Sequence, residues 1–591
     1  MLFRSGLFTG FAQAEPGQLE AARDALLTTL EGLSSVPFTD DEAERARVRG
    51  RRGQERLQSN SSGMAQALSS ASARGDWRLL FIQRDALAAV TAADLNRVAK
   101  TYFPKANRTV GLYIPEDKPQ RLAIQAAPPL DALVKDYKGG KAEAGGESFD
   151  PTPANLDART RVVDLGGIKA GLLQKKNRGE TVSLTLTLHY GNEESLTGQT
   201  TAAALLPAMM MAGTKKHDRQ ALREEFDRLG ISITSGQGGG GRGRGGRSGG
   251  EAGRLTFSVE AKRSTLPAAL DLLGEILREP AFPEADFDRM KRAALAGSAM
   301  ARTEPSVLAV NRLDRLLAPY PPRDIRYVPT PEESAKRIEA VTLEQVKAIY
   351  KDQVGATAGE LAVVGDFDPE PTLAKVRKIL EGWKSEVPIK RIGRTAPGDL
   401  KGTKESLRTP DKANATFTAG LALAMEEAHP EFAALRLGNF ILGGGTLSSR
   451  LGNRIRQKEG LSYGVSSSLT GSPQDHYARF TVTAIVNPAN MDRLEKVFFE
   501  ELKEFLAKGP SDAEVADARK AFLESQKVGR TTDPALAGQI ANNLYLGRTF
   551  AHTTEQEKRI AAVTAEDIKR AFGKYIDLKK LMVIRAGDFE K

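Results

Sequence analysis

Apolar and polar residues alternate with a period of two in three stretches of the chain. Leu184, Leu186 and Leu188 fall on one side of the segment SLTLTLH, and the alternation recurs over residues 255–261 and 478–484. This spacing predicts half-buried strands, each with one apolar and one polar face. Apolar residues at helical spacing between these strands predict helices at residues 201–211, 288–301, 432–442 and 513–528.

One helical pattern occurs three times. AAVTAADLNRVAKTYF begins at Ala88, EAVTLEQVKAIYKDQV at Glu339, and AAVTAEDIKRAFGKYI at Ala561. In each copy a threonine precedes an acidic residue or glutamine by three positions, which is the pattern of a capping box at a helix start. Each helix is predicted to lead into an apolar strand, at residues 109–114, 360–364 and 580–584. The capping pairs are Thr91 with Asp94, Thr342 with Gln345, and Thr564 with Asp567.

The front half of this repeat occurs only twice. One copy spans residues 161–214 and the other begins near residue 401; each ends its helix in a Gly-Thr pair. The sequence therefore predicts an α+β fold of two complete repeats and one partial repeat, with antiparallel-rich sheets packed against helices. The first repeat is expected to be the latter part of a domain whose start is missing. The predicted boundaries are residues 1–125 for the partial repeat, 126–158 for a linker rich in Ala, Gly and Pro, and 159–392 and 398–591 for the complete repeats.

The amino-acid composition excludes several kinds of functional site. Among 591 residues there is no cysteine, which excludes disulfides, thiolate metal sites and a cysteine nucleophile. The five histidines are too far apart in sequence to form a local paired-histidine metal site. A net charge of +10 is modest for this length, and no apolar run is long enough to cross a bilayer. We therefore expect neither a nucleic-acid nor a membrane partner; the compartment stays open, with the periplasm favoured over the cytoplasm for the full-length protein.

A glycine- and arginine-rich segment, GQGGGGRGRGGRSGG, covers Gly236–Gly250. It is compatible with a flexible hairpin loop or with an RNA-binding segment. The loop is favoured because the segment is single, short and free of aromatic residues.

The richest candidate site is the stretch ILGGGTLSSRLGNRIRQKEGLSYGV, residues 441–465. Three glycines allow close approach of another backbone. Arg456 offers a planar set of donors and Tyr463 a hydroxyl on a stiff ring, which together suit the carbonyls and carboxylates of a peptide. The alternative is a glycine helix cap, a surface arginine and a half-buried tyrosine.

The repeats and the segment RIRQKEGLSYG resemble the pitrilysin/insulinase family of zinc metallopeptidases over nearly the whole chain, in a bacterial long form. The resemblance implies homologous α+β domains that enclose an unstructured peptide. It also implies catalytic roles for Arg456 and Tyr463: the tyrosine would donate to the scissile carbonyl and the arginine would hold the peptide. By the same resemblance Gly443, Gly444, Gly445 and Thr446 would bind the substrate strand.

The chain departs from the family at the metal. The family's inverted H-x-x-E-H zinc motif would fall on Ala204–Ala208, and its distant glutamate near Ala296 and Gly297. In the last repeat the same helix offers Arg436, Asn439 and Phe440. We therefore expect zinc in the full-length family and no metal bound by residues of this chain.

Three functions remain open at this stage. The chain is interpreted first as the C-terminal portion of a zinc endopeptidase, inactive by itself, whose partners are an unstructured peptide and a missing N-terminal zinc domain. A second interpretation is a non-catalytic subunit that works with a separate zinc-bearing subunit. The third is a peptide-binding scaffold.

Overall fold

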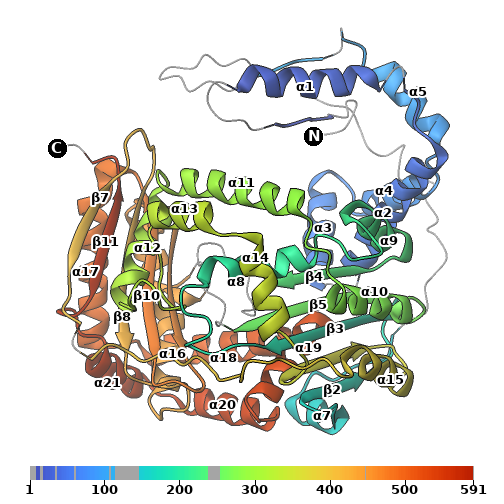
Figure 1. Ribbon diagram of the computed structural model, residues 1–591. Helices are drawn as coiled ribbons and strands as arrows, with labels where there is room; N and C mark the ends of the chain where they lie inside the picture. The colour runs from blue at the N-terminus through green and yellow to red at the C-terminus, as the bar shows by residue number, and fades with distance from the viewer. Residues whose placement is uncertain are drawn as a thin grey trace. The chain divides into compact units, whose positions relative to one another are not determined.

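The computed structural model describes residues 8–12, 18–33, 36–58, 61–105, 108–112, 146–236, 253–398, 400–445 and 448–589 (Figure 1). The chain divides into two compact units. The first holds residues 1–146 with the short segments 177–179 and 223–231, and the second holds the rest. Of the predicted linker, residues 126–145 lie outside the described ranges, and the segment from Glu147 belongs to the second unit. No described helix is both long enough and apolar enough to span a membrane.

The described residues of the first unit form helices and loops, with no strand among them. The predicted capping box is confirmed: the Thr91 side chain accepts from the Asp94 backbone, and Asp94 accepts from the Thr91 backbone. The strand predicted at residues 109–114 is wrong for its described part, because residues 108–112 are not in a ladder. A strand persists only where a neighbour pairs its backbone groups. The helices are α1 (Leu19–Gly32), α2 (Asp40–Gln58), α3 (Ser61–Ala73), α4 (Leu79–Ala88) and α5 (Ala92–Tyr102).

The second unit contains two sheets, and the first of these has six strands in the order β1-β2-β6-β3-β5-β4. Every pairing is antiparallel except β2 with β6. The strands are β1 (Thr160–Asp164), β2 (Ile168–Gln174), β3 (Thr181–His189), β4 (Ser232–Gly236), β5 (Arg254–Lys262) and β6 (Gly359–Gly365). The helices of this half are α7 (Pro153–Arg159), α8 (Thr200–Met210), α10 (Leu266–Arg278), α11 (Glu284–Ala301), α12 (Pro305–Leu317), α13 (Pro331–Ala340), α14 (Leu343–Ala348) with its π-helical extension η2 (Ile349–Gln353), and α15 (Pro369–Leu380). Helix α9 (Arg219–Leu229) begins in the second unit, but its residues from Arg223 onward belong to the first.

The second sheet repeats this pattern with five strands in the order β7-β11-β8-β10-β9. The predicted capping boxes at Thr342 and Thr564 are both confirmed, and so is the α+β fold class. The strands are β7 (Lys404–Arg408), β8 (Ala415–Leu423), β9 (Gly464–Gly471), β10 (Ala478–Val486) and β11 (Met582–Gly587). The helical segments are α16 (Phe432–Asn439), η3 (Phe440–Gly444), η4 (Gly452–Lys458), η5 (Pro488–Asn490), α17 (Met491–Lys508), α18 (Asp512–Val528), α19 (Asp533–Tyr545), α20 (Ala551–Ala562) and α21 (Ala565–Tyr575).

The two halves of the second unit exchange one helix each. Helix α12, from the first half, packs on β8 and β11 of the second sheet, while α19, from the second half, packs on β6, β3 and β2 of the first (Figure 1). Leu313 and Leu317 of α12 join a buried cluster with Ile584 of β11. Ile540 of α19 is buried in a cluster with Val364 of β6. Neither sheet can therefore bury both of its faces with its own half of the chain.

The exchange changes the environment of strand β3. The alternation of leucine with polar residues predicts a half-buried strand, but Ser183 and Thr187 are buried as well as the leucines. The register pairs Ser183 with Val364, so both side chains point to the face that α19 covers. The half-buried expectation is therefore wrong, because a helix distant in sequence covers the polar face. The buried Thr187 hydroxyl forms a hydrogen bond to the neighbouring strand β5, where it lies 3.1 Å from the Thr256 hydroxyl.

A glycine lies under each exchanged helix, and an ion pair holds the start of α19. A Cβ on Gly171 of β2 would collide with Ile540, and one on Gly420 of β8 would come within 3.1 Å of Leu313. Both sheets therefore need a glycine where the helix approaches. Lys175, directly after β2, pairs with Asp533 at the start of α19 over 2.6 Å, with both side chains largely buried.

We expect Leu313→Ala and Ile540→Ala each to lower the free energy of unfolding by about 2–4 kcal/mol, because each leaves a cavity under an exchanged helix. Because each helix links one half to the sheet of the other, both variants should still unfold the second unit in a single transition. Urea titrations followed by circular dichroism measure this. Val162→Ala, at an exposed position of β1, is the control and should change stability little. Loss of one sheet before the other would contradict the reciprocal support.

Candidate functional site

The glycine run of the candidate site ends η3, the π-helical continuation of α16, and lies directly against strand β9. A Cβ on Gly443 would sit 2.7 Å from the hydroxyl and 2.9 Å from the backbone nitrogen of Ser467. A Cβ on Gly444 would sit 2.5 Å from the amide nitrogen of Asn439, and one on Gly445 2.7 Å from the carbonyl oxygen of Phe440. Close packing within the fold thus requires all three glycines. Thr446, the fourth predicted substrate-binding residue, lies outside the described residues.

Arg456 and Tyr463 are brought together at the surface. The buried side chains of Ile455 and Leu461 anchor the chain on either side of a turn at Gly460, whose φ is +63°. This turn places the Arg456 guanidinium carbon 5.0 Å from the centre of the Tyr463 ring, which suits a cation–π interaction. Tyr463 is 88% exposed.

The polar groups of this pair are uncommitted. Within the described ranges, neither the Tyr463 hydroxyl nor the Arg456 guanidinium has a hydrogen-bond or ion-pair partner. A guanidinium carries five donors and a phenol one, so the pair presents several free donors on a conformation fixed by its buried neighbours. Such an arrangement can bind carbonyl or carboxylate oxygens.

Strand β9 begins directly after Tyr463 and is the edge of the second sheet. It pairs with β10 alone in the described sheet, so no described strand pairs with its outer side; only Gly464 at its start bonds the Ser462 hydroxyl there. Its exposed side chains are Ser466, Ser468 and Thr470, and it contains no lysine or proline that would block strand pairing. This edge is therefore able to accept an extended peptide as an added strand.

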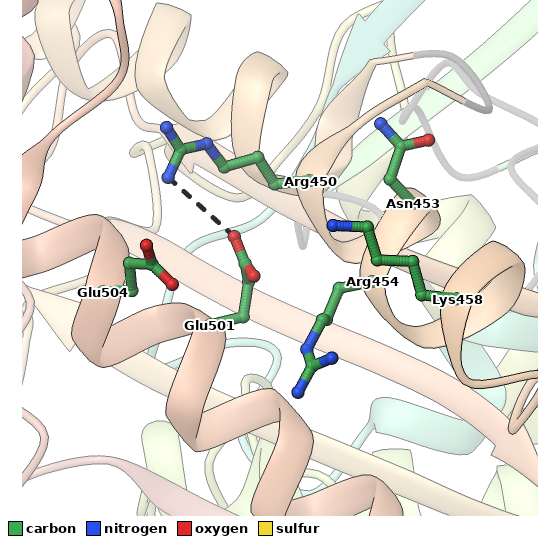
Figure 2. A pocket seen from close by; sticks show the side chains of 6 residues that line it. All are labelled: Arg450, Asn453, Arg454, Lys458, Glu501 and Glu504. Atoms are coloured by element: carbon green, nitrogen blue, oxygen red, sulfur yellow. Dashed lines mark ion pairs between the residues drawn. The ribbon is translucent and has the colours of Figure 1, made fainter.

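Arg450 and Arg454, which lie close to Arg456 in sequence, differ from it because carboxylates engage them. Arg450, Asn453, Arg454 and Lys458 line a hollow of about 270 Å³ opposite Glu501 and Glu504 of α17 (Figure 2). Arg454 pairs with Glu459 over 2.6 Å and with Glu500 over 3.1 Å. The arginines on this side are engaged by carboxylates, so their charges hold η4 against the neighbouring helices.

Arg450 is the centre of that network. It donates two hydrogen bonds to Glu514 of α18, at 2.7 and 2.8 Å, and lies 3.9 Å from Glu501. The bond from Arg450 lowers the pKa of the Glu514 carboxyl to about 2, while burial raises the pKa of Glu501. This network was missed from the sequence, because nothing local pairs Arg450 with a glutamate 64 residues away.

The positions equivalent to a metal site hold no ligands. On α8, Ala204 and Ala208 are exposed, and α8 contacts α11, where Ala296 and Gly297 lie. Methyl groups and a glycine cannot bind a metal ion, so these residues do not fit the zinc of the pitrilysin/insulinase family that the sequence resembles. In the part of the chain that the structure describes, no group of three or more acidic or histidine side chains can hold a metal ion. Of the Gly236–Gly250 loop, only Gly236 lies within the described residues.

Comparison with known protein families gives two matches. The family described as "Insulinase (Peptidase family M16)" matches residues 172–318, and the one described as "Peptidase M16 inactive domain" matches residues 340–522. Together the two regions cover most of the second unit, including the segment with Arg456 and Tyr463.

Individual relatives are distant. The Helicobacter pylori protein named non-peptidase homolog YmxG is 24% identical over 298 residues, which cover 50% of this chain and 66% of that protein. An uncharacterized zinc protease of Streptomyces coelicolor is 23% identical over 414 residues, covering 64% of this chain and 79% of that protein. A crystal structure of a peptidase M16 inactive domain from Pseudomonas fluorescens has the same fold, with a TM-score of 0.62 and 23% identity over 73% of this chain and 98% of that chain.

Gly443→Ala is expected to destabilise the protein by about 1–3 kcal/mol, because the new methyl group meets the backbone of β9. Thermal unfolding measures the loss. Gly464→Ala is the matched control, since a Cβ there meets nothing within 4 Å. Equal stability of the two variants would show that the glycine run is not required for packing.

Glu514→Gln tests the Arg450 network through pH. The folded pKa of Glu514, about 2, lies below the ordinary value of 4.5, so this carboxylate stabilises the fold above pH 4.5 and loses that effect as pH falls toward 2. Because 35% of the Glu514 side chain is exposed, we expect an effect of only about 1 kcal/mol on the free energy of unfolding. Urea titrations at pH 5.5 and pH 2.5 should show a larger loss in the wild type than in the variant, whose glutamine keeps the helix cap. Glu524→Gln, at an exposed position of the same helix, should behave as the wild type.

Proposed function

Because this chain belongs to peptidase family M16, the insulinase family, we propose that its last repeat binds an unstructured peptide through Arg456, Tyr463 and the edge strand β9. The peptide adds to the sheet as an extended strand, and Arg456 holds a carbonyl or carboxylate oxygen. The observation that carries this proposal is the pair of uncommitted donors beside a free strand edge. Arg450 and Arg454 on the same segment are engaged by carboxylates, whereas Arg456 has no carboxylate partner among the described residues.

In peptide hydrolysis Tyr463 has a defined role. Its hydroxyl donates a hydrogen bond to the scissile carbonyl oxygen as that oxygen gains negative charge. One such donor contributes about 3 kcal/mol to the stability of the transition state. The metal chemistry of the family belongs to a zinc-bearing domain from another part of the protein or from a second chain, since Ala204 and Ala208 replace ligands here. This chain supplies binding and polarisation of the peptide.

A second candidate is peptide binding without hydrolysis, as a non-catalytic partner of a zinc-bearing subunit. The apolar surface at Ala204 and Ala208 favours it, and one relative is named a non-peptidase homolog. Both candidates share the peptide site and differ only in whether Tyr463 ever acts on a bond being cleaved.

Binding of a fluorescent unstructured peptide to the full chain, followed by anisotropy, tests the shared site. Arg456→Met should weaken binding about tenfold, because a charge-assisted hydrogen bond contributes about 1.5 kcal/mol. Tyr463→Phe should change affinity by less than about twofold, since its hydroxyl acts on developing charge. Arg161→Met and Tyr102→Phe, at exposed positions elsewhere, are the matched controls.

Unchanged affinity in Arg456→Met would contradict the site. Incubation of the chain alone with zinc and peptide should give no cleavage. Robust zinc-dependent cleavage would overturn the assignment of the metal to another domain.

A further inference from the structure

Helix α16 presents two polar side chains whose hydrogen-bonding capacity is unused. The Arg436 guanidinium lies over the Phe522 ring, with its carbon 5.1 Å from the ring centre, and has no hydrogen bond or ion pair to any described residue. Asn439 follows three positions later and is 7% exposed. Its Oδ1 is buried and has no partner in the described structure. Residues three apart lie on the same side of a helix, so the two side chains are neighbours.

Leaving these groups unpaired is costly. A buried acceptor without a partner carries the full desolvation penalty of that group, and native proteins leave few of them. Burial also lowers the pKa of the Arg436 guanidinium, because the field of Glu427 compensates its charge only partly. Glu427 is shared with Arg548, 3.8 Å away. This part of the helix layer therefore has an excess of donors and positive charge next to one free acceptor.

Asn439 adjoins the proposed peptide site, and Arg436 lies one turn before it on the same helix. Asn439 lies beside Gly444 in the turn that packs on β9, and its carbonyl oxygen is 3.4 Å from the hydroxyl of Ser467 in that strand. Arg436 and Phe440, one turn apart, both contact the ring of Phe522. The unused groups thus lie on the element that supports the edge strand.

We propose that Arg436 and Asn439 form a subsite for a carboxylate that carries a neighbouring N–H group, the chemistry of the C-terminal residue of a peptide. The Arg436 guanidinium takes the carboxylate with its planar pair of donors, and Asn439 Oδ1 accepts the N–H. This inference rests on the proposed peptide-binding function and deepens it. It assigns to the last repeat a preference for peptides that present a carboxylate to α16. A terminal carboxylate and an acidic side chain share this chemistry.

Three forms of one labelled unstructured peptide distinguish the sources: the free acid, the C-terminal amide, and an amide with glutamate as its last residue. Anisotropy with the full chain should show the free acid binding at least about tenfold more tightly than the plain amide, a difference of 1.4 kcal/mol. Recovery of affinity by the glutamate peptide would identify any suitably placed carboxylate as the ligand. No recovery would identify the chain terminus.

Variants assign the preference to the two side chains. Arg436→Met keeps an unbranched stem over Phe522 and removes the charge, so it should abolish the difference between acid and amide. Asn439→Leu keeps the volume and removes the acceptor, so it should weaken both forms about threefold to tenfold. Arg161→Met should keep the full preference. If Arg436→Met does not fold by circular dichroism, Arg436→Lys keeps the charge without the planar fork and should keep part of the preference.

Equal binding of acid and amide by the wild type overturns the subsite and leaves the proposed function intact. The subsite is also overturned if Arg436→Met leaves the preference for the acid unchanged, or if Arg436→Lys keeps that preference at full strength. Failure of the wild type to bind any of the three peptides contradicts the proposed function itself and the subsite with it.

Discussion

The reciprocal exchange of α12 and α19 is the constraint on which the second unit depends. Each sheet has one face that helices of its own half do not cover, and the helix that buries it comes from the other half. The buried clusters around Ile540 and Leu313 are therefore interfaces between the two repeats as much as cores. Removal of apolar area from water drives their formation, so neither repeat has a complete core by itself.

This arrangement leaves the strand edges for function. Helix α12 covers β8 and β11 on one face of the second sheet, and β9 lies at the edge of that sheet, where no described strand pairs with its outer side. The close packing of η3 fixes that strand from one side, and the anchored turn at Gly460 fixes the side chains that precede it. A binding site on a rigid edge loses little conformational freedom when an extended peptide adds to it.

The two repeats have diverged at equivalent positions of one helix. On α8 the positions that the resemblance assigns to the two zinc-binding histidines hold Ala204 and Ala208, both exposed, whereas on α16 they hold Arg436 and Phe440, with Asn439 at the position of the intervening glutamate. The alanine side chains on α8 offer only apolar contact and no group that can bind a metal ion or form a hydrogen bond. Arg436 and Asn439 keep donors and an acceptor that the fold itself does not use. The second repeat therefore has polar side chains on this helix where the first has alanines.

The sequence by itself determined the local structure. Periods of 2 and 3.6 located the strands and helices, and the capping residues Thr342 and Thr564 marked helix starts, because these signals act over a few neighbouring residues. The family resemblance pointed to Arg456 and Tyr463, which the fold then brought within cation–π distance. Only the tertiary structure decided that the polar face of β3 is buried, that Arg450 is engaged by Glu514, and that the glycine run packs on Ser467. Each of these three features depends on a partner tens or hundreds of residues away or on how two surfaces fit together. Neither distant contacts nor surface fit produces a periodic pattern in the sequence.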